Sequence, residues 1–175
     1  MIDDWDMWLT DASEREGVTL RPLQPEDLEE VLRIIRLHDT DDFEAAADTF
    51  DYYDFEGALE DTAYFVLEDA PDGGESRPLG VTGYYPDHET RQTYWLGWTY
   101  VNPFQQGSGY GSALLRFLLE TLGRLDVRKL YLSTSSLEKY DRAVGFYEDH
   151  GFVREACLDD YYAEGEDQLI FARTL

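Results

Sequence analysis

The sequence predicts an α/β fold of the α+β kind, in which about seven strands form a mixed, mostly antiparallel sheet flanked by about four helices. Three observations predict it. Strand-like and helix-like segments follow one another in the order βααβββαβαββ. Several strands are joined directly across short Gly, Pro and Asp turns, which favours antiparallel pairing. The length of 175 residues fits a single domain, with a core over residues 18–174 and an N-terminal arm over residues 1–16.

The first third of the chain predicts one strand and two helices. Val18–Arg21 has the pattern of a strand, and Pro25 begins a helix with Glu26 and Asp27 in its first turn, where the helix dipole favours acidic side chains. Apolar residues then recur at helical spacing. We expect a second, weakly amphipathic helix from Phe43 to about Leu59.

The remaining elements follow from strand patterns, turn clusters and one strongly amphipathic segment. The turn cluster Pro71–Gly74 separates the first two of the later strands. One helix is expected from Gly109 to Gly123, and a shorter one from Asp141 to His150, which Gly151 would end as a C-terminal cap. The later strands are expected over residues 63–68, 78–85, 93–101, 129–133, 152–156 and 168–172.

The chain is very acidic, because 38 Asp and Glu residues outnumber 14 Lys and Arg residues and give a formal net charge of −24. Nucleic acids and anionic membranes bind clustered Lys and Arg, so the charge argues against both partners. The acids are spread along the whole chain, and their repulsion destabilises a compact protein unless salt screens it. We therefore expect a halophilic protein in a salt-rich cytoplasm, and an acidic protein without that adaptation is the alternative. The N-terminal residues also lack the features of a signal peptide.

Metal and disulfide chemistry is not expected. Cys157 is the one cysteine, so neither an internal disulfide nor a cysteine-cluster zinc site can form. His38, His88 and His150 lack the spacing of metal ligands. Cys157 lies in an expected strand, and we interpret it as a small core residue.

A glycine-rich loop over Gln106–Gly111 connects an expected strand to an expected helix. Glycines allow positive φ angles and a close approach to a ligand. The exposed N–H groups of the loop and of the following helical turn would then form an anion site suited to phosphate. A tight turn that only packs the helix on the sheet is an alternative. A dinucleotide site fits poorly because several hairpins precede the loop, and a Walker loop is excluded because no Gly-Lys-Ser/Thr follows.

Two segments resemble the GNAT family of N-acetyltransferases. Val101–Leu115 is similar to motif A of that family, a strand followed by V-x-P and then Q/R-x-x-G-x-G/A at a helix start. Arg142–Phe152 is similar to motif B, A-x-x-F-Y-E-x-x-G-F. The element order also matches, and the resemblance covers residues 18–174. It implies a sheet whose fourth and fifth strands, about 93–101 and 129–133, splay apart to admit acetyl-CoA.

The resemblance also implies the binding residues and one catalytic residue. Val101 would offer main-chain groups to the pantetheine arm. Tyr147, the motif B tyrosine, would protonate the leaving thiolate. Tyr140 stands where the family often has an asparagine that contacts the cofactor. The pyrophosphate would rest on the loop and the first helical residues, which are Gln106, Gly107, Ser108, Gly109, Tyr110, Gly111 and Ser112.

The general base is the weak point of this resemblance. Family members often carry a glutamate in the fourth strand, whereas Tyr94–Tyr100 contains no carboxylate. A base would have to come from Asp87, His88 or Glu89 in the preceding turn, or from water held by the main chain and Tyr100.

The acceptor implied by the resemblance is a primary amine, on a small molecule or on a peptide N-terminus. Asp160–Asp167, with Tyr161-Tyr162, is similar to a segment of members that acetylate protein N-termini, and we expect a mobile loop there. An acyl-CoA-binding regulatory module of the same fold is the alternative, and an unrelated nucleotide-binding protein is a third. Strand exchange and sheet pairing are common in the family, so a homodimer is also open.

Overall fold

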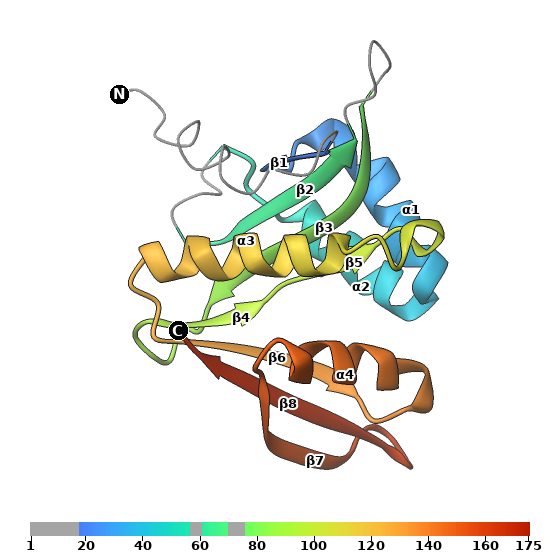
Figure 1. Ribbon diagram of the computed structural model, residues 1–175. Coiled ribbons are helices and arrows are strands. Elements are labelled where there is room, and N and C mark those ends of the chain that lie inside the picture. The colour runs from blue at the N-terminus through green and yellow to red at the C-terminus, as the bar shows by residue number, and fades with distance from the viewer. Residues whose placement is uncertain (1–17, 57–60, 70–75) are drawn as a thin grey trace. The chain divides into compact units, whose positions relative to one another are not determined.

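The computed structural model describes residues 18–56, 61–69 and 76–175 (Figure 1). The expected arm over residues 1–16 lies outside these residues, as does the turn over residues 71–74. The chain divides into two compact units. The first contains the residues up to Tyr85 together with Gly97–Thr121, and the second contains Pro86–Leu96 and Leu122–Leu175. Whether they act as one domain stays a prediction.

The first unit is built on an antiparallel sheet. β1 (Val18–Pro22) pairs with β2 (Ala63–Asp69), and β2 pairs with β3 (Arg77–Pro86). The short strand β5 (Tyr100–Val101) also pairs with β3 in antiparallel fashion. The strands expected over residues 18–21, 63–68 and 78–85 are therefore confirmed.

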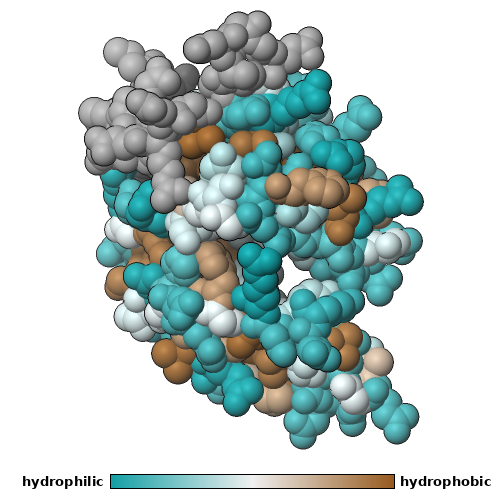
Figure 2. Space-filling view, turned by 45° about the vertical axis from the view of Figure 1, so that its right-hand side comes forward, coloured by the Kyte–Doolittle hydropathy of each residue, from teal (hydrophilic) through white to brown (hydrophobic). Residues whose placement is uncertain are grey.

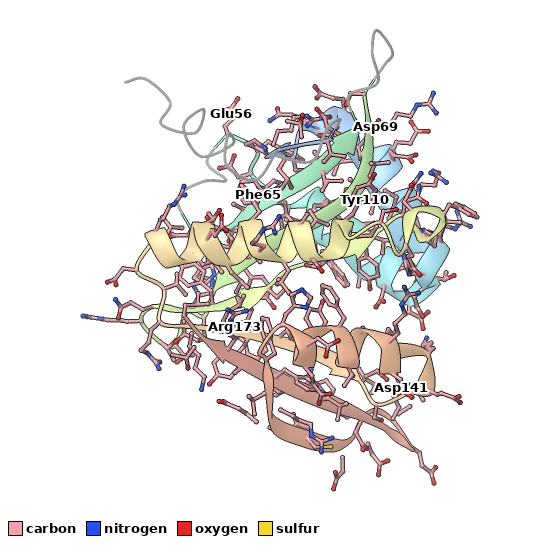
Figure 3. All side chains as sticks on the ribbon, viewed as in Figure 1. Glu56, Phe65, Asp69, Tyr110, Asp141 and Arg173 are labelled. Atoms are coloured by element: carbon pink, nitrogen blue, oxygen red, sulfur yellow. The ribbon has the colours of Figure 1, made fainter. Side chains whose placement is uncertain are left out.

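Helices cover both faces of this sheet. A 3₁₀ turn, Pro25–Asp27, leads into α1 (Leu28–His38), and α2 (Thr40–Asp51) follows. One core cluster joins Val31, Ile35 and Phe50 of these helices to Tyr64 and Val66 of β2. On the other face, α3 (Tyr110–Arg124) packs on the sheet, with the Phe117 ring 4.9 Å from the Phe65 ring (Figures 1 and 3). The alternating side chains of β2 thus serve both helical layers.

The second helix begins earlier and ends earlier than the apolar pattern predicts. Its N-terminus is set by Asp39, whose side chain accepts hydrogen bonds from the N–H groups of Asp41 (2.8 Å) and Asp42 (3.2 Å). An aspartate in this position satisfies helical N–H groups that would otherwise lack an acceptor. The helix ends at Asp51, and residues 57–59 of the expected helix lie outside the described residues.

The second unit contains a four-stranded sheet in the order β4-β6-β8-β7. β4 (Thr93–Leu96) and β6 (Lys129–Ser135) are parallel, while β8 (Glu166–Thr174) is antiparallel to both β6 and β7 (Val153–Ala163). A 3₁₀ turn, Glu138–Tyr140, precedes α4 (Asp141–Asp149). Gly151 follows this helix with a φ of +81°, the left-handed conformation expected of its C-terminal cap.

The parallel pair separates after three residues. The register joins Thr93 to Lys129, Tyr94 to Leu130 and Trp95 to Tyr131, and no further pair of β4 and β6 is found in the described residues. β6 nevertheless continues to Ser135, paired with β8. The expected mixed, mostly antiparallel sheet with diverging fourth and fifth strands is confirmed.

The last hairpin corrects two expectations. Tyr161 and Tyr162 lie in β7 rather than in a loop, because the strands run on to a tight turn in which Gly165 has a φ of +80°. The turn is closed by Asp160, whose carboxylate accepts from the Gly165 N–H at 2.6 Å. Cys157 is exposed and not a core residue, since β7 is an edge strand whose residues mostly face solvent.

The surface agrees with the composition. The face drawn in Figure 2 is mostly hydrophilic, with small hydrophobic patches. Among the helices of the described residues, none is both long and apolar enough to cross a lipid bilayer.

Candidate functional site

The strand expected over residues 93–101 is interrupted by a β-bulge. The Gly97 N–H donates to the Gly83 carbonyl at 2.7 Å, and the Asn102 N–H donates to the Leu79 carbonyl at 2.8 Å. Between these two hydrogen bonds the chain advances by five residues from Gly97 to Asn102, but by only four between Leu79 and Gly83 of β3. One strand therefore contains an extra residue. Because Tyr100 and Val101 are already in register with β3, the extra residue lies at positions 98–99.

Tyr64 of β2 explains the position of the bulge. A Cβ atom on Gly97 would lie 2.8 Å from the Tyr64 ring, so only glycine fits against that ring. The Tyr64 hydroxyl forms a hydrogen bond with the Trp98 main chain, although burial is the main influence on its pKa and raises it. Thr99 closes the bulge, because its hydroxyl donates to the Gly97 carbonyl at 3.1 Å.

The bulge determines which main-chain groups remain open. In an antiparallel pair, residues in hydrogen-bonded positions alternate with residues whose N–H and C=O point away from the partner strand. Asn102 is in a hydrogen-bonded position opposite Leu79, so Val101 points its N–H and C=O away from β3. The Thr99 N–H has no acceptor in the described part of the chain. Thr99 was not expected as a site residue, since the bulge depends on a distant tyrosine.

The glycine loop directly follows this open edge. Asn102 organises its start by accepting from the Phe104 N–H at 3.0 Å, and a 3₁₀ turn covers Pro103–Gln105. Gly107 and Gly109 have φ angles of +85° and +78°, which L-residues rarely adopt. The first helical hydrogen bond of α3 joins the Ala113 N–H to the Gly109 carbonyl at 3.0 Å. The loop therefore has the conformation that its glycines predict.

Several amide groups of this loop can receive an anion. For Gly107, Gly109, Tyr110 and Gly111, no acceptor of the main-chain N–H lies among the residues that the structure describes. Tyr110 opens α3 (Figure 3), so the positive end of the helix dipole adds to these donors. Gln106, Ser108 and Ser112 already interact with other groups of the protein, so they are not counted among these open donors. The arrangement suits a phosphate group without a cationic side chain.

The second unit holds the two tyrosines of the predicted site. Tyr147 lies in α4, and its ring contacts Phe146 and Phe152 with centroid distances of 5.4 Å and 5.7 Å. Burial raises the pKa of its phenol, and no described residue forms a hydrogen bond with the hydroxyl. Tyr140 occupies the position before α4, where the Lys139 ammonium lies 4.9 Å from its ring centroid.

The predicted base candidates are divided between the units. In the second unit, Asp87 accepts a hydrogen bond from the Trp95 indole N–H at 3.1 Å, which is the main reason why its pKa is lowered. A lowered pKa makes this carboxylate a poor base. In the first unit, the Tyr100 hydroxyl donates to Asp42 Oδ2 at 2.5 Å. Of the predicted site residues, Val101 and residues 106–112 lie in the first unit, whereas Tyr140 and Tyr147 lie in the second.

One group of potential metal ligands was not anticipated. Cys157, Asp159 and Asp167 of the last hairpin have ligand atoms within 4.8 Å of one another. All three hold other contacts within the hairpin, such as the Asp160 N–H that donates to Asp167 at 2.9 Å. Exposed acidic groups gather in this way without an ion, so the expectation that the protein needs no metal stays a prediction.

Known proteins provide an independent comparison. A family model described as the acetyltransferase (GNAT) family matches residues 31–152. A Desulfovibrio desulfuricans structure described as belonging to that family is 28% identical, with a TM-score of 0.80 over 90% of this chain and 99% of that chain. Curated protein sequences give no match.

Two further solved structures share the fold at lower identity. The Escherichia coli ribosomal-protein-S18-alanine N-acetyltransferase is 23% identical, with a TM-score of 0.69 over 90% of this chain and 93% of that chain. An aminoglycoside 6′-N-acetyltransferase complexed with coenzyme A is 14% identical, with a TM-score of 0.67 over 89% and 96%. At these identities the likeness concerns the fold alone.

Proposed function

The chain belongs to the acetyltransferase (GNAT) family, and we propose that it transfers the acetyl group of acetyl-CoA to a primary amine. The acceptor is an amine of a small molecule or the N-terminus of a peptide. The observation that carries this proposal is a series of open main-chain groups in two parts of the first unit: Thr99 and Val101 at the strand edge, and the N–H groups of Gly107, Gly109, Tyr110 and Gly111 in the loop. These groups match a ligand that has both amides and phosphates.

Acetyl-CoA would use two parts of this series. The amide N–H groups of its pantetheine arm would donate to the carbonyls of Thr99 and Val101 at the open sheet edge, which leaves the Thr99 N–H for another ligand atom. The Val101 carbonyl also accepts from His38, but a carbonyl oxygen has two lone pairs. Alternate residues of a strand are about 6–7 Å apart, so two successive open positions suit an extended chain with two amides. The pyrophosphate would bind the N–H groups of Gly107, Gly109, Tyr110 and Gly111.

The chemistry needs three contributions from the protein. The acceptor amine must be neutral before it attacks the thioester carbon. The oxyanion that then forms needs an N–H donor, and the Thr99 N–H in the bulge is the donor that we assign. The departing thiolate needs a proton, which we assign to Tyr147, because a phenol is protonated at neutral pH and can donate.

A panel assay tests this function. Wild-type protein in multimolar KCl is mixed with acetyl-CoA and a peptide with an N-terminal alanine, an aminoglycoside or spermidine, and the released thiol is measured. We expect amine-dependent thiol release and an acetylated product by mass spectrometry with at least one acceptor. Acetyl-CoA binding without turnover on any amine would contradict the catalytic proposal.

That contradicting result would favour a second function. The stretch Tyr94–Tyr100 contains no carboxylate, and this observation favours an acyl-CoA-binding regulatory module of the same fold. Such a module would bind acetyl-CoA through the same main-chain groups and would not need a base.

A further inference from the structure

The proposed transfer requires a base, and the fourth-strand region does not supply one as a carboxylate. Among the other expected base candidates, Asp87 accepts a hydrogen bond from the Trp95 indole, which lowers the pKa of the carboxylate. The Tyr100 hydroxyl donates a hydrogen bond to Asp42. A base requires a lone pair on an atom near the open edge of β5. His38 lies beside this edge.

His38 contacts the open edge directly. It is the last residue of α1, and its Nε2 lies 2.8 Å from the Val101 carbonyl oxygen. The imidazole also packs on Tyr100, with ring centroids 5.2 Å apart. Val101 is one of the two residues whose main-chain groups point away from β3. His38 therefore reaches the edge along which the thioester arm is proposed to bind.

The hydrogen bond to Val101 determines the tautomer of His38. A carbonyl oxygen can only accept, so Nε2 must carry the proton and donate it. In the neutral imidazole, the lone pair is then on Nδ1. Nδ1 has no partner among the residues that the structure describes, and the side chain is exposed. The ring is thus oriented by its N–H and open at its basic nitrogen.

The charged groups near His38 lie on its own helix and on the elements packed against it. The residue ends α1, where the helix dipole is negative. Asp39 is its neighbour in sequence, and Asp42 of α2 is connected to it through Tyr100 of β5. The nearest cation on its own helix, Arg36, lies over the Phe43 ring at 5.3 Å. The 3₁₀ turn Pro103–Gln105 contributes no titratable group.

We propose that His38 is the general base of the transfer and takes a proton from the acceptor ammonium at Nδ1. This inference rests on the proposed function. The ammonium loses one proton to His38, and the neutral nitrogen forms a bond to the thioester carbon. The nitrogen then loses its second proton to water as the C–S bond breaks. The thiolate takes a proton from Tyr147 and leaves as the free thiol of CoA, and Tyr147 regains a proton from water. His38 returns its proton to water, so the net reaction releases one proton.

The test separates the base from the structural contact. His38→Gln keeps an N–H donor near the position of Nε2, and so can keep the hydrogen bond to Val101, but it has no basic nitrogen. His38→Ala removes both. Each variant is compared with wild type for thiol release, with the panel amine that wild type uses best, and for acetyl-CoA affinity by calorimetry.

We expect kcat/KM of both variants to fall about 100-fold, the typical contribution of a general base. We expect the acetyl-CoA affinity of His38→Gln to stay within about twofold of wild type, because the main-chain groups are kept. The activity of His38→Gln should also recover as the pH rises, since more of the amine is then neutral without help.

Three results would overturn the proposal. The first is a His38→Gln variant as active as wild type, which would reduce the residue to a structural contact. The second is loss of activity in His88→Gln with His38→Gln unaffected, which would move the base to the turn before β4. The third is a wild-type protein that releases no thiol with any amine, and this result alone also contradicts the proposed function.

Discussion

At the scale of single residues, Tyr147 is the group whose chemistry depends most on its surroundings. Its ring packs on Phe146 and Phe152, and burial raises the pKa of the phenol. The raised pKa keeps the hydroxyl protonated to higher pH than in a free tyrosine, so it can donate across the neutral range. The protonated phenol can donate to a developing thiolate, although its raised pKa makes it a weaker acid than a free tyrosine.

Tyr147→Phe should therefore lower kcat by about 100-fold while acetyl-CoA affinity stays nearly constant, because the ring keeps its packing and only the hydroxyl is lost. Steady-state kinetics and calorimetry measure the two quantities. Tyr52→Phe is the control, since Tyr52 is an exposed tyrosine that follows α2 and has no assigned role. Unchanged turnover in Tyr147→Phe would remove this tyrosine from the mechanism.

Gly107 tests the anion site at the same scale. It has a φ of +85°, and nothing lies within 4 Å of a Cβ atom placed on it, so alanine there would strain the backbone without a clash. We expect Gly107→Ala to weaken acetyl-CoA binding by about tenfold, since a strain of about 1–2 kcal/mol opposes the binding conformation. Calorimetry measures the affinity.

Gly165 provides a matched control for Gly107. Its φ is +80°, and it has equally open surroundings, but it lies in the turn of the last hairpin. Gly165→Ala should cost similar stability and leave acetyl-CoA affinity unchanged. Equal affinities in the two variants would show that the loop does not hold the ligand.

At the scale of elements, the bulge between β4 and β5 depends on one contact. A Cβ atom on Gly97 would lie 2.8 Å from the Tyr64 ring, which is buried. Gly97→Ala should lower the free energy of unfolding by about 1–3 kcal/mol, because the ring or the bulge must shift. Acetyl-CoA affinity should fall as well, since Thr99 and Val101 would change direction.

Urea unfolding at constant KCl measures the first effect. Gly123→Ala in α3 is the control, because nothing lies within 4 Å of a Cβ atom there and alanine stabilises a helix by up to about 1 kcal/mol relative to glycine. A Gly97→Ala variant as stable as Gly123→Ala would contradict the assigned role of Tyr64.

The sequence predicts the elements that depend on local patterns, but not those that depend on distant residues. The spacing Gly107, Gly109 and Gly111 before an amphipathic helix predicts the loop and the start of α3, because both are local features. The bulge depends on Tyr64, more than thirty residues away in the chain, so no local pattern near Thr99 indicates it. The start of α2 depends on capping by Asp39, which the apolar pattern from Phe43 does not indicate.

The candidate site also contains residues that motifs predict and residues that they do not. Gln106–Ser112 and Tyr147 follow from motif spacing, whereas His38 has no motif. Its hydrogen bond to Val101 joins residues 63 positions apart. The last hairpin was expected to be shorter because polar residues such as Asp159 and Asp160 carry little strand signal, although an edge strand tolerates them.

At the scale of the whole molecule, the net charge of −24 is the dominant physical fact. We expect the free energy of unfolding to rise markedly between low and multimolar KCl, because salt screens the repulsion among the acids. Urea unfolding at both salt concentrations measures it. Equal stability in the two conditions would contradict the halophilic interpretation.

A double variant in α2 sharpens this test. Asp48 and Asp51 are exposed at the C-terminal end of the helix, where the dipole disfavours anions, and Asp48 also lies one turn after Glu44. Asp48→Asn with Asp51→Asn should therefore stabilise the protein at low KCl and have little effect at multimolar KCl. An equal gain in both conditions would mean that charge is not the cause.

The most direct test of the account is titration calorimetry of acetyl-CoA into the full chain in multimolar KCl. The main-chain groups from Thr99 to Gly111 predict saturable binding of one acetyl-CoA per chain, with weaker or no binding of a dinucleotide such as NAD. The absence of any binding heat with either acetyl-CoA or free CoA would contradict the account.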